Sequence, residues 1–108
     1  MNEQLILTAA EDGRCVDVEV GQTVVIQLKE TPTTGYRWTL QTHKADAIEV
    51  TDSGWRCPPN AQVGAAGQRE FCLLVRGKGR IQLALKLCRQ WEGERAAVES
   101  HIYTLVAR

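Results

Sequence analysis

The sequence has little of several features that identify whole classes of protein. Its 108 residues include 13 basic and 13 acidic side chains, so the formal net charge is zero. A balanced charge disfavours functions that depend on bulk charge, such as non-specific binding to nucleic acid. No apolar run approaches the ~18 residues of a membrane-spanning helix, so we expect no membrane span.

The first residues also lack the pattern of a secretory signal, which is a basic region followed by an apolar stretch. We therefore expect a cytoplasmic protein, with a periplasmic or secreted protein as the alternative if a signal was removed before Met1. A length of 108 residues favours a single domain over residues 1–108. We expect this domain to be a monomer.

Paired metal ligands and catalytic groupings are missing as well. No two cysteines form a CxxC pair, and His43 and His101 are not spaced as ligands of one metal ion. The sequence shows no paired carboxylates, nucleophile elbow or metal-ligand cluster. We therefore expect no metal, no cofactor and no enzymatic activity.

The four cysteines leave two interpretations open, because they form two disulfides in an exported domain and stay free in a reducing compartment. Cys72 and Cys88 lie inside apolar runs and are expected to be small buried residues. Cys57 lies in the proline-containing stretch 55–60, which predicts an exposed loop and a reactive thiol. Cys15 is the fourth cysteine.

The dominant hydrophobic period is two, which predicts half-buried β-strands. In residues 80–87, for example, Ile81, Leu83 and Leu85 alternate with polar or small residues. Clusters of Gly, Pro, Asp, Asn and Ser separate such segments and predict turns. The predicted fold is an all-β antiparallel sandwich of about seven to eight strands. The predicted strands cover residues 5–9, 15–20, 23–29, 36–41, 47–51, 69–76, 80–87 and 98–107.

Charge is uneven along the chain. Residues 1–68 hold five basic and nine acidic side chains, whereas residues 69–95 hold seven basic and three acidic ones. Solvated strand faces explain this pattern. The alternative is that one end of the sandwich is basic and attracts an acidic partner.

The stretch 31–35 does not look like an ordinary turn. Pro32 fixes its own backbone and pushes Thr31 toward an extended conformation. The two following threonines are β-branched and stiff, and Gly35 permits a positive φ. The sequence predicts a loop with little conformational freedom, which serves either as a simple hairpin turn or as a rigid wedge.

Two further stretches are unusual. Residues 64–67, Gly-Ala-Ala-Gly, predict a loop with few side chain atoms, which lets a partner approach the main chain. Arg89, Gln90 and Trp91 follow the most regular strand pattern. Trp91 is either an exposed binding anchor beside Arg89 or a lid folded back on the core, and both interpretations stay open.

Taken in order, these three stretches resemble the motifs of the chagasin-like inhibitors of cysteine peptidases. Residues 31–38, Thr-Pro-Thr-Thr-Gly-Tyr-Arg-Trp, resemble the NPTTGxxW motif of that family. Residues 64–67 with Phe71 resemble its GxxGxxxF motif, and residues 89–91 are similar to its RPW motif. The three occur in the family's order and at similar spacings, and the similarity covers nearly the whole chain.

The resemblance implies an immunoglobulin-like β-sandwich whose three loops, at one end, enter the cleft of a papain-like cysteine peptidase. Inhibition would be reversible and competitive. Residues 31–35 would form the central loop with Thr33 at its tip, and the other two loops would lie against opposite walls of the cleft. Trp38 is expected in the core. The implied peptidase-binding residues are Thr31, Pro32, Thr33, Thr34, Gly35, Tyr36, Gly64, Ala65, Ala66, Gly67, Arg89, Gln90 and Trp91.

Two positions depart from the family pattern. Thr31 replaces the asparagine of the first motif, and threonine bonds its own loop backbone less well. Gln90 replaces the proline of the third, which raises the entropy cost of binding. The alternative function is an immunoglobulin-like binding or adhesion module with a non-peptidase ligand, because sandwiches host many functions.

Overall fold

The structure of the chain is a computed structural model that describes residues 4–31, 34–56, 67–89 and 97–108. Within these ranges the chain forms eight strands and one short 3-10 helix. In chain order they are β1 (Leu5–Leu7), η1 (Ala9–Glu11), β2 (Cys15–Val18), β3 (Thr23–Glu30), β4 (Tyr36–Thr42), β5 (Ile48–Arg56), β6 (Gly67–Val75), β7 (Gly79–Arg89) and β8 (Glu99–Ala107).

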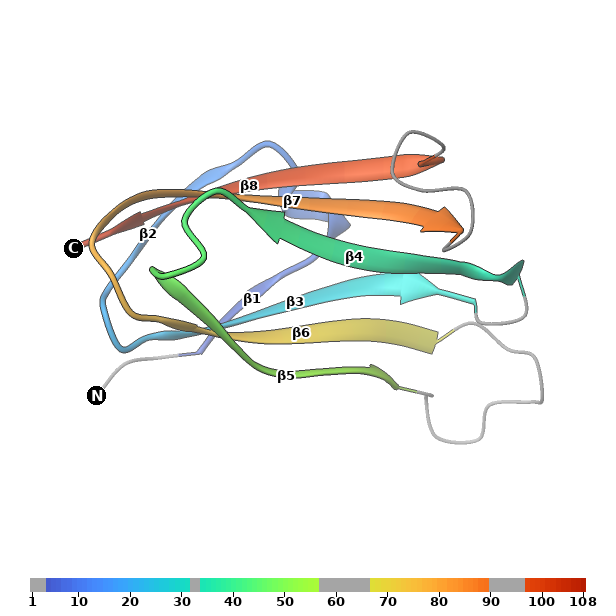
Figure 1. Cartoon of the computed structure of the whole chain (residues 1–108), viewed down its shortest axis with the longest axis horizontal. Coiled ribbons are helices and arrows are strands. Elements are labelled where there is room, and N and C mark those ends of the chain that lie inside the picture. Colours follow the sequence, from blue (N-terminus) through green and yellow to red (C-terminus); the bar gives the residue numbers. More distant parts are fainter. Residues whose placement is uncertain (1–3, 32–33, 57–66, 90–96) are drawn as a thin grey trace.

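The strands form two four-stranded sheets that pack face to face (Figure 1). The strand order is β1-β3-β6-β5 in the first sheet, here called sheet A, and β2-β8-β7-β4 in the second, here called sheet B. The predicted β-sandwich is therefore confirmed. Within the described residues, no helix is long and apolar enough to cross a membrane.

The sheets are mixed rather than purely antiparallel, which corrects one part of the prediction. β1 runs parallel to β3, and β2 runs parallel to β8. The 3-10 helix η1 carries the chain from sheet A to sheet B, so β1 and β2 each join a different sheet beside a distant strand. Alternation reports which face of a strand is buried but not which way its neighbour runs.

The predicted strand positions are confirmed, but several bounds differ, and β5 and β7 in particular are longer than predicted. β5 continues from Ile48 to Arg56 through Asp52 and Gly54, which the sequence marks as a turn. A bulge between Val50 and Asp52 absorbs one residue and lets the strand keep its pairing with β6. β6 begins at Gly67, two residues earlier than predicted.

The core is built from the inward-facing alternate residues of both sheets. Ile26, Leu73, Leu83 and Leu105 are all completely buried. Trp38 is 5% exposed, which confirms its expected place in the core. Close packing of such side chains supplies most of the stabilising free energy of a domain this small.

The cysteine predictions are confirmed in part. Cys88 is buried, whereas Cys72 is half-buried. Burial raises the pKa of the Cys72 thiol, and the nearby carboxylates of Asp52 and Glu70 raise it further. The thiols of Cys15, Cys72 and Cys88 are free in the structure, and Cys57 lies outside the described residues.

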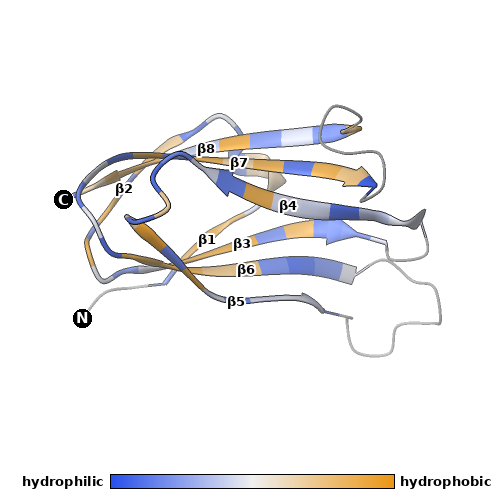
Figure 2. Ribbon diagram, in the orientation of Figure 1, coloured by the Kyte–Doolittle hydropathy of each residue, from blue (hydrophilic) through white to orange (hydrophobic). Residues whose placement is uncertain are grey.

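The residues of β6 change from hydrophobic to hydrophilic toward the right-hand end of the molecule (Figure 2). We call the end where β3 and β7 finish and β4 and β6 begin the loop end, and the opposite end the far end. Along β3 the inward residues run from Val24 at the far end to Glu30 at the loop end. Along β6 they run from Val75 to Arg69 in the same direction. Along these two strands the interior is therefore aliphatic at the far end and holds a buried ion pair at the loop end.

Candidate functional site

The strand ends that flank the three motif-bearing segments lie together at the loop end. The segment 31–35 joins β3 of sheet A to β4 of sheet B, so it passes from one sheet to the other. The segment 57–66 joins β5 to β6 within sheet A, and the segment 90–98 joins β7 to β8 within sheet B. The strand ends that flank them all lie at the right-hand end of Figure 1. The connectivity thus brings the described flanks of all three motifs to one end, where the first motif links the two sheets.

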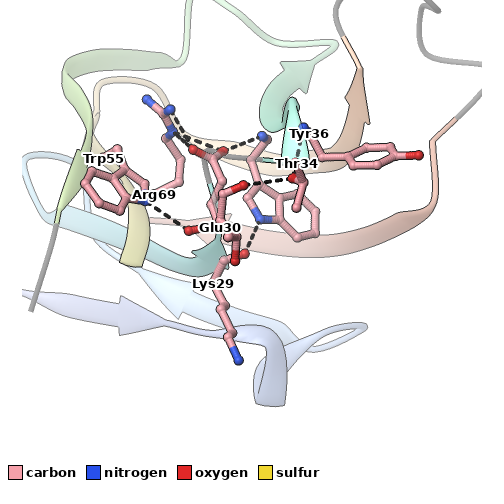
Figure 3. Close-up of polar contacts among 8 residues, drawn as sticks. Lys29, Glu30, Thr34, Tyr36, Trp55 and Arg69 are labelled. Atoms are coloured by element: carbon pink, nitrogen blue, oxygen red, sulfur yellow. Dashed lines mark hydrogen bonds and ion pairs between the residues drawn. The ribbon is translucent and has the colours of Figure 1, made fainter. Parts of the chain in front are cut away.

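The described part of segment 31–35 is braced by its own hydrogen bonds (Figure 3). The Thr34 hydroxyl donates to the carbonyl oxygen of Thr31 at 2.8 Å and accepts the backbone N–H of Tyr36 at 3.2 Å. The Thr34 backbone N–H donates to the same Thr31 oxygen at 3.2 Å. Gly35 has φ +80°, which confirms the positive φ that the sequence predicts there. Thr34 therefore acts in the loop as an internal brace.

Seven of the implied binding residues lie outside the described residues: Pro32, Thr33, Gly64, Ala65, Ala66, Gln90 and Trp91. Thr31, Thr34, Gly35 and Tyr36 flank the first gap, and Gly67 and Arg89 flank the other two. The structure thus places the base of each motif at the loop end.

Tyr36 and Arg89 connect the first motif to the third. The two residues are paired across β4 and β7. The Arg89 guanidinium carbon lies 4.6 Å from the centre of the Tyr36 ring, in a cation–π contact. This contact holds the end of β7 against the strand that leaves segment 31–35.

Gly67, the last glycine of the second motif, lies in a strand rather than on the loop. It is the first residue of β6, it is buried, and it pairs with Glu30 of β3. A Cβ at this position would meet the Arg56 carbonyl oxygen and the Trp55 ring, each at 2.4 Å. Glycine is required here because Trp55 packs directly on the backbone.

Sequence reasoning missed the buried polar group of the site. Glu30 is 2% exposed, and Arg69 forms a bidentate pair with its carboxylate, with Nη2 to Oε2 at 2.7 Å. The Glu30 Oε1 atom also accepts the backbone N–H of Trp38 at 2.8 Å. A signal was present in the sequence, because Glu30 continues the inward alternation Val24, Ile26, Leu28 with a charged residue.

The uneven charge along the chain does not produce one basic end. Arg69 is held by Glu30, with its side chain 18% exposed. Arg76 and Arg80 lie near the turn between β6 and β7, which is at the far end. The basic stretch therefore spans the whole length of the sandwich, in agreement with solvated strand faces.

His101 of β8 is engaged in contacts inside the fold. Its ring stacks on Trp38 with centroids 5.3 Å apart, and its nitrogens face Asp12 at 3.3 Å and Glu99 at 2.7 Å. The backbone N–H of Ile102 and the His101 ring hold the pKa of Asp12 below its usual value. Among the residues described here, no three His, Cys, Asp or Glu side chains gather to hold a metal ion.

Comparisons with known proteins agree with this geometry. A family model described as chagasin family peptidase inhibitor I42 matches residues 17–106. Chagasin of Trypanosoma cruzi is 30% identical over 91 residues, which cover 81% of this chain and 83% of that protein. The crystal structure of the cysteine protease inhibitor EhICP2 from Entamoeba histolytica superimposes with a TM-score of 0.87 at 27% identity, covering 97% of this chain and 96% of that one. PbICP-C, solved in complex with falcipain-2, shares the fold with a TM-score of 0.67 at 16% identity, covering 99% of this chain and 91% of that one.

Proposed function

This chain belongs to the chagasin family of peptidase inhibitors, and from that membership we propose that it is a reversible, competitive inhibitor of papain-like cysteine peptidases. The observation that carries the proposal is that the strand ends flanking all three family motifs lie at one end of the sandwich. The relatives support the choice of target class, because EhICP2 is a cysteine protease inhibitor. An inhibitor of this kind has no catalytic residues of its own.

The central loop 31–35 enters the peptidase cleft beside the catalytic cysteine. A papain-like cleft accepts an extended substrate and holds one carbonyl against the thiolate. The loop instead turns sharply, with Gly35 at φ +80° and Thr34 bonded back to Thr31. It fills the substrate space without offering a carbonyl in position for attack.

The other two segments contact the walls of the cleft. Segment 57–66 joins two strands of sheet A and segment 90–98 joins two strands of sheet B, which agrees with contacts on opposite walls. Main-chain groups of residues 64–66 and the side chains of Arg89 and Trp91 are the proposed contacts. Loops held on a rigid sandwich lose little conformational entropy on binding, which favours tight association across an interface of ordinary size.

The proposal is tested by titrating the purified protein into papain, with trypsin as the control peptidase. We expect papain to be inhibited at or below micromolar inhibitor, trypsin to remain active, and the recovered inhibitor to be uncleaved. Full papain activity at micromolar inhibitor contradicts the proposal. Inhibition that disappears as the inhibitor is cut contradicts the reversible mechanism.

A second experiment tests the central loop itself. Gly35→Glu places a bulky charge in a residue with positive φ at the loop end, and we expect papain inhibition to be lost. Gly79→Glu is the matched control, because Gly79 also has a positive φ, of +114°, but lies at the far end. Equal inhibition by both variants contradicts the wedge role of segment 31–35.

The alternative function, an adhesion or other binding module with a non-peptidase ligand, is not favoured. The matching family, to which chagasin belongs, is a family of peptidase inhibitors, and EhICP2 is a cysteine protease inhibitor.

A further inference from the structure

The contacts of Glu30 join the strands that carry the first two motifs. Glu30 is the last residue of β3, directly before segment 31–35. Its carboxylate accepts the backbone N–H of Trp38 in β4, on the other side of that segment. The same carboxylate accepts hydrogen bonds from Nε and Nη2 of Arg69, which lies two residues after the start of β6. The Glu30 side chain therefore joins the two flanks of the first segment, β3 and β4, to β6, the strand that follows the second segment.

Two indole rings complete the arrangement (Figure 3). The Trp38 indole N–H donates to the carbonyl oxygen of Lys29 at 2.9 Å, and the Trp55 indole N–H donates to that of Glu30 at 2.9 Å. Trp55 comes from β5, next to the start of segment 57–66. The other three strand ends that flank the first two motifs, from β4, β5 and β6, thus all bond to the last two residues of β3.

This arrangement is an unusual choice for stability alone. Removing a carboxylate and a guanidinium from water is costly, and well-packed apolar residues of similar volume are often as stabilising or more so. The neighbouring inward positions on the same two strands are apolar, with Leu28 and Phe71 both buried. A bidentate ion pair supplies what an apolar contact lacks, which is a fixed relative orientation of the two strands.

We propose that Glu30 and Arg69 form a positioning pair, which sets the placement of segment 31–35 relative to the start of β6. This inference rests on the proposed function for its consequence, because a fixed spacing between the first two motifs pre-organises them for one cleft. Neither residue needs to touch the peptidase. The pair acts through the loops that it holds.

The test separates positioning from stability by removing both charges together. The double variant Glu30→Gln with Arg69→Met keeps the side-chain volumes and an oxygen that accepts the Trp38 N–H. We expect its thermal midpoint to stay within about 5 °C of the wild type. Its inhibition constant for papain should rise at least about tenfold, because binding must then order the loops.

The matched control is an ion pair that joins β6 to its other neighbour in sheet A, β5. Arg56 Nε contacts Glu70 at 2.8 Å, with the Arg56 side chain 54% exposed. Because exposed pairs contribute little, Glu70→Gln with Arg56→Met should change the inhibition constant less than about twofold. Ile81→Val, a core change on β7 opposite Leu105 of β8, controls for loss of stability and should leave the inhibition constant unchanged.

A second measurement detects a change in the position of the first loop in the free protein. In amide NMR spectra, the double variant should shift the signals of Thr34, Gly35 and Tyr36, which lead into β4 of sheet B. The Glu70/Arg56 control should leave these signals unchanged. Shifts confined to β3 and β6 overturn the inference, as does wild-type inhibition by the folded double variant. If that variant does not fold, Arg69→Lys replaces it, since lysine keeps the charge but loses the two-pronged contact.

The two proposals fail in different ways. Absence of papain inhibition by the wild type defeats the proposed function and leaves the NMR comparison to decide on the positioning pair. Inhibition by the wild type with no change in the double variant defeats the positioning pair alone.

Discussion

The two ends of this sandwich are built from the same strands but by different chemistry. At the far end the inward residues of β3, β6 and β7 are Val24, Val75 and Ile81, all buried. At the loop end the same strands present Glu30, Arg69 and Arg89. Apolar packing is strong but has no preferred direction, whereas hydrogen bonds and ion pairs fix orientation. We therefore expect the far half of the interior to contribute most to stability and the loop half to fix the geometry of the loops.

The largest effect on stability should come from the apolar interior. Leu105 of β8 is completely buried, so Leu105→Ala should lower the free energy of unfolding by about 2–5 kcal/mol, measured by urea denaturation. At a temperature where this variant stays folded, its inhibition constant for papain should equal that of the wild type. A weakened inhibition constant in the folded variant contradicts the division between the two ends.

A smaller loss of stability, joined to a loss of inhibition, should follow a change behind the second motif. Gly67→Ala brings a methyl group against the Trp55 ring and the Arg56 carbonyl, which should cost about 1–3 kcal/mol and displace the start of β6. Gly54→Ala on β5 is the control, because a Cβ there meets nothing within 4 Å. Equal denaturation midpoints for the two variants contradict the close approach at Gly67.

Tyr103 lies midway along β8, opposite Leu83. The dependence of its contribution to stability on alkaline pH tests the middle of the interior. The Tyr103 hydroxyl donates to the Thr8 carbonyl oxygen at 2.8 Å, so Tyr103→Phe should cost about 1 kcal/mol near neutral pH. Burial raises the pKa of Tyr103 to about 12. An unfolded tyrosine releases its proton near pH ~10, so the unfolded state gains stability relative to the folded state between pH ~10 and the folded pKa.

The wild type should therefore lose stability over that pH interval relative to Tyr103→Phe. The measurement is the difference between their unfolding free energies at successive pH values. A constant difference contradicts the burial of the Tyr103 hydroxyl.

The smallest effect on stability should come from the exposed brace of the first loop. Thr34→Val removes the hydroxyl bonded to Thr31 and Tyr36, and the unfolding free energy should fall by no more than about 1 kcal/mol. Inhibition of papain should nevertheless weaken, because the loop loses its internal hydrogen bonds. Thr39→Val is the control, since that hydroxyl reaches the Lys86 carbonyl only at 3.4 Å. Equal inhibition constants for the two variants count against the brace.

Most of the fold was predictable because alternation is a local signal. A segment of alternating apolar residues, such as Ile81 to Leu87, predicts a strand whichever strands lie beside it. The parallel pairings of β1 and β2 were not predictable, because they depend on which distant strand lies alongside. The extension of β5 through Asp52 to Gly54 was missed because a bulge tolerates residues that otherwise mark a turn.

The part of the candidate site that consists of motif residues could be predicted from the sequence. The part that consists of supporting contacts between distant residues could not. The resemblance in residues 31–38 located the first loop, and the positive φ of Gly35 followed from its residue type. The pairing of Glu30 with Arg69 joins residues 39 positions apart, and its recognition requires the register of β3 against β6. The sequence predicts Gly67 on the loop, because its contact with Trp55 depends on the equally non-local pairing of β5 with β6.

Mapping of the surface that papain perturbs tests most directly whether the loop end is the inhibitory end. Amide NMR signals of the labelled protein are recorded before and after addition of papain. Signals of Thr31, Thr34, Gly35, Tyr36 and Arg89 should shift or broaden strongly, while those of the far end, including Gly79 and Ala107, should follow only the uniform broadening of a larger complex. Specific perturbation at the far end, or no perturbation at either end, would contradict inhibition through the three loops.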